Sequence, residues 1–181
     1  MLQITIPSTE LWDEQKEEFV YRKEKTLQLE HSLVSVSKWE SKWNKSFLST
    51  ADKTEEEIID YIRCMTITQN VDPEVYSRLS NPIINEIYDY INAPMTATVF
   101  SDNGQNSRRS REAVTSELIY YWMIALNIPF ECQKWHLNRL LTLIRVCEVK
   151  NAPPKSMNKR DIMSHNAALN AARRKKYNTK G

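Results

Sequence analysis

Glycine is nearly absent from this chain, which contains only Gly104 and Gly181. Phosphate-cradling loops and dinucleotide fingerprints need several glycines where the backbone approaches the ligand, so both classes of site are excluded. The three cysteines are an odd number without the paired spacing of a disulfide framework or a zinc site, which favours a reduced, intracellular compartment. The N-terminal sequence MLQITIPSTE lacks a basic segment and a long apolar run, so we expect no signal peptide. No stretch reaches bilayer-spanning length without charges.

Charge is distributed unevenly along the chain. Residues 155–181 contain eight Lys or Arg and one Asp, a net charge of +7, and the whole chain carries +2, so residues 1–154 carry 2 − 7 = −5. The hydrophobic fraction of 41% is sufficient for a core, and 181 residues suffice for one domain with an appendage. We therefore predict a single domain over residues 1–154 and a basic C-terminal helix or tail over residues 155–181.

Hydrophobic periodicity predicts a change of structure near residue 31. Apolar and polar residues alternate over 2–6 and 26–30, and 19–21 is a further short β candidate, so residues 1–31 are predicted to form a small β element, a hairpin or three short strands. From Ser32 onward the apolar spacing is three or four, which predicts a helix with Trp39 and Trp43 on one face. The predicted fold class is mainly α, with this small N-terminal β element and a basic C-terminal helix.

Three helix start signals follow in the middle of the chain. One is a capping box, and the other two are a capping side chain followed by proline at the first helical position. They are Thr54-Glu55-Glu56-Glu57, Asp72-Pro73 and Asn81-Pro82. The second and third signals predict short helices over 73–79 and 82–91. The polar stretch 101–111 is predicted to be an exposed loop, and a last helix is predicted over roughly 159–176.

An apolar block spans residues 116–147 and reads SELIYYWMIALNIPFECQKWHLNRLLTLIRVC. It is interrupted at 127–129, where Pro129 removes a backbone donor and restricts Ile128 away from the helical region, so two antiparallel helices are predicted. The block must be buried in its own fold or in a partner. The residues predicted to form the core of this helical hairpin are Trp122, Trp135, Leu137, Leu140, Leu141 and Ile144.

Candidate chemistry in this block is limited to Cys132 and His136, which lie four residues apart on the second predicted helix. A zinc site would need further paired ligands, and a cysteine nucleophile would need an orienting group and an oxyanion hole. A core cysteine beside a partly buried histidine is the favoured interpretation. The prediction is a protein that is not an enzyme and that has no catalytic, cofactor-binding or metal site.

Aromatic and basic residues are the candidates for partner binding. Aromatics at helical spacing are usually core residues or interface anchors. The basic C-terminus could neutralise phosphates, but the rest of the chain is acidic and Tyr177 is the lone aromatic nearby, so specific nucleic-acid binding is not favoured. The candidate partner-binding residues are Trp39, Trp43, Trp122, Trp135, Arg173, Arg174, Lys175 and Lys176.

Four stretches of the chain, 26–43, 91–100, 116–147 and 173–181, resemble small proteins encoded by long-tailed phages and are similar to the tail assembly chaperones of siphophages. The resemblance covers most of the chain and rests on general character, so it assigns no role to a particular residue. It implies a mostly helical, non-enzymatic protein of the host cytoplasm that needs no cofactor. Its implied partners are the tape measure protein, which such chaperones coat before tail tube subunits polymerise, the tail tube protein, or a second copy of the chain, with no membrane involved. Many such chaperones also have a frameshifted long form, with which an A-rich codon run at 174–176 is compatible.

Two other functions remain open from the sequence. The chain could be a virion structural protein of the tail or of the head–tail connection, which would place it in the virion. It could instead be a small nucleic-acid-binding regulator that uses its basic C-terminus. An enzyme is the least supported class.

Overall fold

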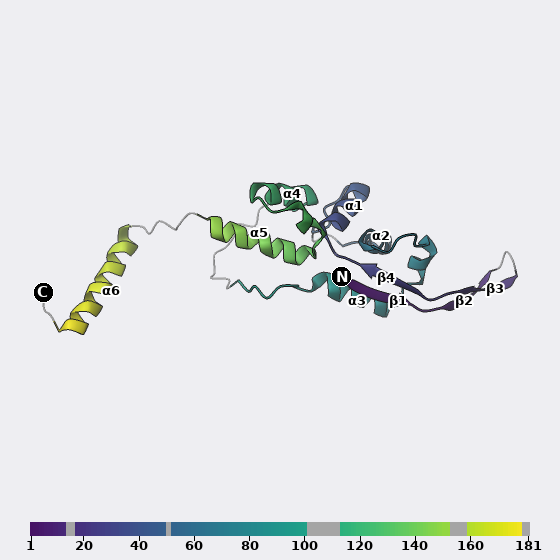
Figure 1. Ribbon diagram of the computed structural model, residues 1–181, viewed down its shortest axis with the longest axis horizontal. Helices are drawn as coiled ribbons and strands as arrows, with labels where there is room; N and C mark the ends of the chain where they lie inside the picture. Colours follow the sequence, from purple (N-terminus) through teal and green to yellow (C-terminus); the bar gives the residue numbers. More distant parts are fainter. Residues whose placement is uncertain (14–16, 50–51, 101–112, 153–158, 179–181) are drawn as a thin grey trace. The chain divides into compact units, whose positions relative to one another are not determined.

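The computed structural model describes residues 1–13, 17–49, 52–100, 113–152 and 159–178 of the chain, and it is mainly helical with small antiparallel β-hairpins at the N-terminus (Figure 1). The predicted fold class is confirmed. The chain divides into a first unit, Met1–Glu148, and a second unit, Val149–Gly181. The predicted loop at 101–111 and the Pro153-Pro154 pair lie outside the described residues.

Among the described residues, the first unit contains four strands, five α-helices and two short 3-10 helices, the last of the α-helices, α5, running on past the boundary, and the second unit adds the helix α6. In chain order they are β1 Leu2–Ile6, β2 Thr9–Asp13, β3 Glu18–Arg22, β4 Lys25–Leu29, α1 Leu33–Trp43, α2 Glu55–Met65, η1 Pro73–Arg78, α3 Asn81–Asn92, α4 Ser116–Ala125, η2 Phe130–Lys134, α5 Leu137–Asn151 and α6 Lys159–Tyr177.

The strands form two consecutive antiparallel ladders. β1 pairs with β4, with Leu2 opposite Leu29 and Ile6 opposite Lys25, and β2 pairs with β3 beyond it. Pro7 follows β1 and has no backbone N–H, which agrees with the interruption between the ladders. The expected strands near residues 2–6 and 26–30 are therefore present, and β2 is an additional strand that the sequence pattern did not predict.

The core joins the β1–β4 ladder to the helices. Alternate side chains of β1 and β4 are buried, as the two-residue period requires. The buried apolar side chains with a relative exposure of 1% or less include Ile6, Leu27, Leu29, Leu33, Val36, Trp39, Ile62, Met65, Ile87, Ile119, Met123, Leu137 and Leu140. Of the residues predicted for the core of the 116–147 block, Leu137, Leu140 and Ile144 are buried, whereas Leu141, Trp122 and Trp135 are partly buried against the core.

The helix start signals were mostly correct. Thr54 and Glu57 form the predicted capping box of α2, with both reciprocal hydrogen bonds present. Asp72 caps the next segment through the N–H of Glu74, but this segment is a 3-10 helix. The prediction that Asn81 is an N-cap was wrong: Ser80 occupies that position without a side-chain hydrogen bond, and Asn81 is the first residue of α3.

The apolar block breaks where expected, but its second half differs from the prediction. α4 ends at Ala125, Asn127 adopts a left-handed φ of 53°, and η2 follows Pro129. α5 begins only at Leu137, because His136 forms an isolated antiparallel β-bridge with Ser32. The N–H of Leu137 also donates to the carbonyl oxygen of His31 at 2.7 Å. The second helix is therefore shorter at its start than the pattern suggested. Cys132 belongs to η2 and not to the helix that follows His136, which corrects their predicted shared helical face.

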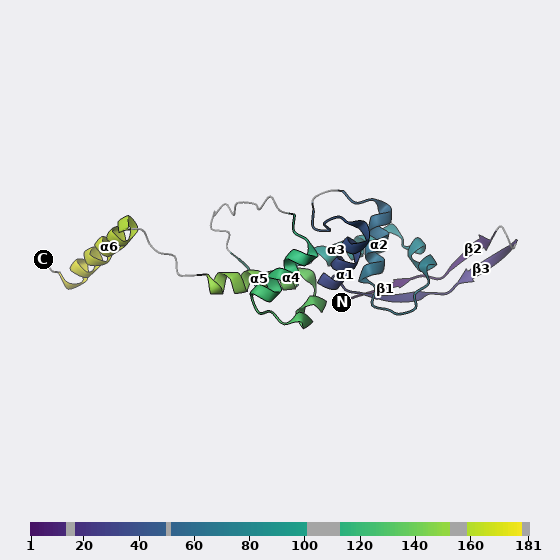
Figure 2. The same cartoon turned by 90° about the horizontal axis from the view of Figure 1, so that it is seen from above.

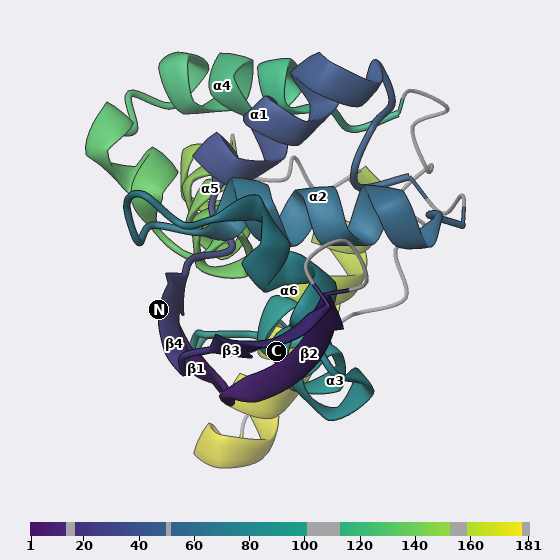
Figure 3. The ribbon, with the colours of Figure 1, turned by 90° about the vertical axis from the view of Figure 1, so that its right-hand side faces the viewer.

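The helices of the first unit lie in layers around the strand ladder. Figure 3 looks along the β2–β3 ladder, with α1 and α4 side by side on one side of α2 and with β1, β4 and α3 on its other side. Figures 1 and 2 show that β2 and β3 project from one end of this unit, beyond the helices. In the second unit, α6 spans the range predicted for the last helix to within one residue.

Candidate protein-binding surface

The projecting β2–β3 ladder, which we call the arm, carries the most exposed aromatic residues of the strands. Trp12 lies directly opposite Phe19, and Glu10 lies opposite Tyr21. Because alternate residues of a strand point to the same side, these four side chains share one face of the arm. The rings of Trp12 and Phe19 meet edge to face with centroids 4.9 Å apart. Their geometry is that of a cross-strand aromatic pair, which stabilises a two-stranded ladder.

This aromatic face is open to solvent. Trp12, Phe19 and Tyr21 are 52%, 71% and 58% exposed. A cluster of large exposed apolar side chains on a protein surface usually marks a contact surface for another macromolecule. Two-stranded ladders also leave unpaired backbone groups along their edges, which adds a second way to contact a partner. The arm is therefore a candidate protein-binding element.

The base of the arm is fixed to the helical part of the first unit by η1. The Arg78 guanidinium donates hydrogen bonds to the carbonyl oxygens of Pro7 and Lys23, which lie on the two sides of the break between the ladders. Arg22 forms an ion pair with Glu74 at 2.6 Å. These contacts connect both chain segments at the arm's base to one 3-10 helix. The arm that carries the aromatic face is therefore anchored at its base to η1.

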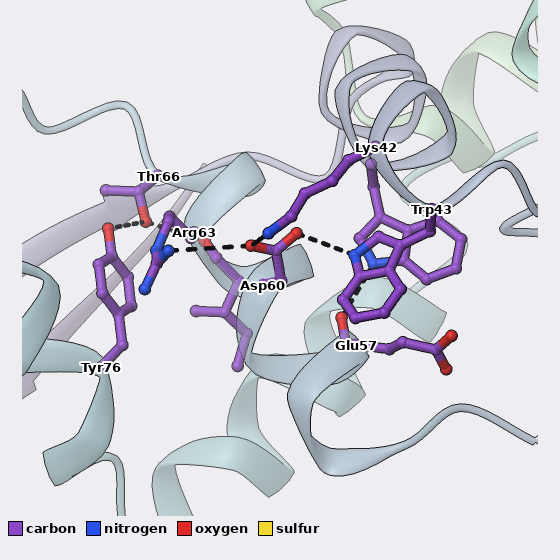
Figure 4. Close-up of polar contacts among 9 residues, drawn as sticks. Lys42, Trp43, Glu57, Asp60, Arg63, Thr66 and Tyr76 are labelled. Carbon is purple, nitrogen blue, oxygen red and sulfur yellow. Dashed lines mark hydrogen bonds and ion pairs between the residues drawn. The ribbon is translucent and has the colours of Figure 1, made fainter.

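The two tryptophans predicted to bind a partner from α1 are placed differently. Trp39 is 1% exposed and belongs to the core, with its indole N–H donating to the carbonyl oxygen of Glu57 at 2.9 Å. Trp43 is partly buried, stacks on Trp39 with ring centroids 6.2 Å apart, and donates to Asp60 at 3.0 Å (Figure 4). Both rings therefore join α1 to α2, and Trp39 takes no part in the surface of the described structure.

Acidic side chains of α2 complete this junction. Lys42 contacts the Asp60 carboxylate at 2.5 Å, and Lys45 contacts the Glu57 carboxylate at 2.5 Å. Burial acts to raise the pKa of Asp60, but the hydrogen bonds from Lys42 and Trp43 outweigh it and the pKa is lowered (Figure 4). The hydrogen bond from Lys45, followed by that from the backbone of Thr54, lowers the pKa of Glu57. Both carboxylates are therefore ionised. Their contacts stabilise the packing of α2 against α1 and the segment that follows it, which is a structural role.

A second apolar surface lies on α4 and η2. Tyr121, Ile124 and Phe130 are 63%, 61% and 53% exposed. Trp122 and Trp135, both candidates from the sequence, are partly buried beside this surface, and the Arg139 guanidinium covers the Trp135 ring at 4.2 Å. This surface extends the apolar area available to a partner. Unlike the arm, it does not lie on a strand ladder that projects from the unit.

The four basic candidates, residues 173–176, occupy the last two turns of α6 in the second unit, and their side chains are exposed. The C-terminal end of a helix favours cations through its dipole, which is consistent with a helix ending in this cluster. These positions are free to contact an acidic partner.

A pocket of about 530 Å³ lies between α2, α3 and the segment after α1. Its lining is largely isoleucine and aromatic, with the buried His31 hydrogen-bonded to the Tyr61 hydroxyl at 2.5 Å. Burial, and then the charge of nearby His136, lowers the pKa of His31 to about 3, so His31 is neutral at physiological pH. Within the described ranges, no group of three or more His, Cys, Asp or Glu side chains is placed to hold a metal ion.

Comparisons of the chain with protein-family models, with curated proteins and with solved structures gave no match.

The arm was not predicted as a functional element, because β2 lacks a strict alternation of apolar and polar residues. The available signal was the recurrence of bulky aromatics at positions 12, 19 and 21 on either side of an acidic stretch.

Proposed function

We propose that this chain is a tail assembly chaperone of a long-tailed phage, a non-enzymatic protein that binds the tape measure protein in the host cytoplasm. The observation that carries the proposal is the exposed aromatic face of the arm, formed by Trp12, Phe19 and Tyr21. The resemblance of the chain to siphophage tail assembly chaperones supplies the identity of the partner. The helices of the described residues include none long and apolar enough to cross a bilayer.

A long helical partner suits this surface. An amphipathic helix presents apolar side chains every three or four residues, and it binds to an apolar surface without any cofactor. Tryptophan and tyrosine are the residues most often found at the energetic centre of such interfaces. The exposed side chains of α4 and η2 offer additional apolar area for the same partner, so binding requires no reaction and no metal.

The test is co-expression with the tape measure protein encoded by the same phage. The wild-type chain should co-purify with the tape measure protein and keep it soluble. Trp12→Ser combined with Phe19→Ser should weaken this complex, because removal of a central aromatic side chain costs about 2 kcal/mol or more, roughly thirtyfold in affinity. Tyr88→Ser is the matched control, since Tyr88 is 58% exposed on α3, away from the arm.

An arm variant that folds, as judged by unchanged circular dichroism, and still binds the tape measure protein like the wild type would contradict the role of the arm. A wild-type chain that does not bind the tape measure protein would contradict the proposed function. Mass spectrometry of purified virions then separates the alternatives, because a virion structural protein is retained in the particle.

The charge of α6 keeps nucleic-acid binding as a second candidate. The described part of this helix contains six Lys or Arg and one Asp, a net charge of +5. A phosphate-binding helix should bind duplex DNA with a binding constant whose logarithm falls steeply and linearly with the logarithm of the salt concentration. A filter-binding titration of the purified chain measures this directly, and a flat, weak response would remove the candidate.

A further inference from the structure

We propose that α6 of one copy of the chain docks on the arm of a second copy. The arm and α6 carry opposite charges, and each exposes apolar side chains. The same sequence therefore supplies both halves of a contact. This inference concerns the association of the chain with itself and does not depend on the tape measure protein.

One side of α6 combines apolar and basic side chains. Ile162, Leu169, Arg173 and Lys176 are separated by seven, four and three residues, so they follow one side of the helix. Ile162 and Leu169 are each 43% exposed. The side of α6 that they form is apolar in its first half and basic in its second half.

The arm offers the complementary features. Glu10 lies on its aromatic face, opposite Tyr21, while the exposed acids Glu17 and Glu18 lie at the tip of the arm, with Glu18 on the other face. The one basic residue of its strands, Arg22, is already engaged by Glu74 in an ion pair. Aliphatic side chains of α6 can pack on the aromatic rings, while arginine and lysine can contact both carboxylates and ring faces.

A second copy is the favoured occupant because of where the arm lies in the first unit. Figures 1 and 2 show the arm projecting from one end of this unit, and α5, in which the unit ends, leading away from it. Within the first unit, the C-terminal end therefore lies away from the arm. A contact of this kind is heterologous: repeated between copies it gives an open chain or closes into a ring, and a reciprocal exchange gives a dimer.

The experiment is sedimentation velocity on the full chain over a range of protein concentrations, at about 0.1 M and about 1 M salt, where the Debye length is about 10 Å and about 3 Å. The wild type should associate with increasing concentration and associate less at high salt. Glu10→Lys with Glu18→Lys, or Arg173→Glu with Lys176→Glu, should each weaken association about tenfold, as expected for close charge pairs across an interface. Combining the arm and α6 reversals in one chain should restore association.

Two charge-matched controls separate a specific contact from a general effect of net charge. Arg174→Glu with Lys175→Glu makes the same change on other sides of α6. Glu86→Lys with Asp89→Lys makes the same change as the arm variant on exposed positions of α3. Both controls should associate like the wild type.

Three results would overturn the proposal. The first is a wild-type chain that remains monomeric at every concentration at low salt. Docking of α6 on the arm of the same copy would give this result too, and it would equally contradict the proposal. The second is a control variant that loses association as strongly as its matched test variant. The third is the absence of recovery when the two reversals are combined. All of these results are obtained on the chain alone, without the tape measure protein, so the two proposals fail separately.

Discussion

Leu140 and Leu141 are adjacent on α5 and have the same side chain, but their surroundings differ. Leu140 is fully buried, whereas Leu141 is only partly buried against the core. The helical pattern of the sequence placed both in the core, so replacing each with alanine tests what the structure adds. Alanine has the same helix propensity advantage at both positions, and this contribution cancels in the comparison.

The expected magnitudes follow from burial. Leu140→Ala removes a side chain that is 0% exposed and leaves a cavity, so it should lower the free energy of unfolding by about 3–4 kcal/mol. Leu141→Ala removes a side chain that already contacts solvent, so the loss should be about 1 kcal/mol. For a unit of this size, 1 kcal/mol corresponds to a shift in melting temperature of about 3 °C. The two variants should therefore melt about 10 °C and about 3 °C below the wild type.

The assay is thermal unfolding followed by circular dichroism, supported by urea titration to obtain free energies. Equal shifts for the two variants, or a larger shift for Leu141→Ala, would show that α5 is rotated from its described orientation. Unchanged melting for both would mean that this side of α5 is a surface for a partner and not a core.

The remaining predictions concern a buried histidine, a buried carboxylate and the second unit. Burial, with the His136 charge second, holds the folded-state pKa of His31 at about 3, below its unfolded value of about 6.5, so its contribution to stability is complete above pH 6.5 and is lost as the pH falls towards 3. The free energy of unfolding should therefore decline between pH 6.5 and pH 4 by up to about 1.4 kcal/mol per pH unit. In urea titrations, His31→Asn should flatten this decline. The control His165→Asn, at an exposed histidine, should leave the decline unchanged. The Glu40 carboxylate accepts the backbone N–H groups of Phe47 at 2.8 Å and Ser116 at 2.7 Å, so Glu40→Ala should destabilise by about 2–4 kcal/mol in the same titration, and Glu40→Gln by less because one acceptor oxygen remains. Removal of the second unit should leave the melting temperature of the first unchanged, and aggregation or loss of cooperative melting in the shortened chain would show that α6 contributes to the core.

Local rules predicted most helices because the information is contained within a few residues. The capping box at Thr54 and the three-to-four spacing after Ser32 each specify a helix without reference to the rest of the chain. Alternation likewise predicted β1 and β4, since their inner faces are buried. These are the cases in which propensity, pattern and burial agree.

The start of α5 could not be predicted in this way. Its position depends on the hydrogen bond from the N–H of Leu137 to the carbonyl oxygen of His31, more than a hundred positions earlier, and on the bridge between Ser32 and His136. A pairing between distant backbone segments has no local sequence signal. The same limit explains Trp135, which was expected in the hairpin core but lies at the end of η2 with Arg139 over its ring.

The sequence predicted which types of residue are candidates for partner binding, but not which of these residues are exposed. Aromatic and basic residues were identified as partner-binding candidates, but the exposure of each ring depends on which elements cover it. Trp39 lies between α1 and α2 and is buried, whereas Trp12, on a strand that the pattern did not predict, is half exposed on the arm. Exposure is a property of the assembled fold, so residue type alone could not separate the two.

The union of β1 and α5 in one core has a consequence for biosynthesis. Ile4 and Leu27 belong to the same buried cluster as Leu137 and Leu140, which the ribosome adds far later. The strand ladder can form as soon as β4 has been made, but the buried cluster to which its apolar residues belong is incomplete until α5 emerges. A nascent chain would therefore keep part of this apolar cluster exposed, and prone to aggregation, until late in its synthesis. Completion of the fold should be a late event, and a pause placed before α5 should increase the yield of aggregated product.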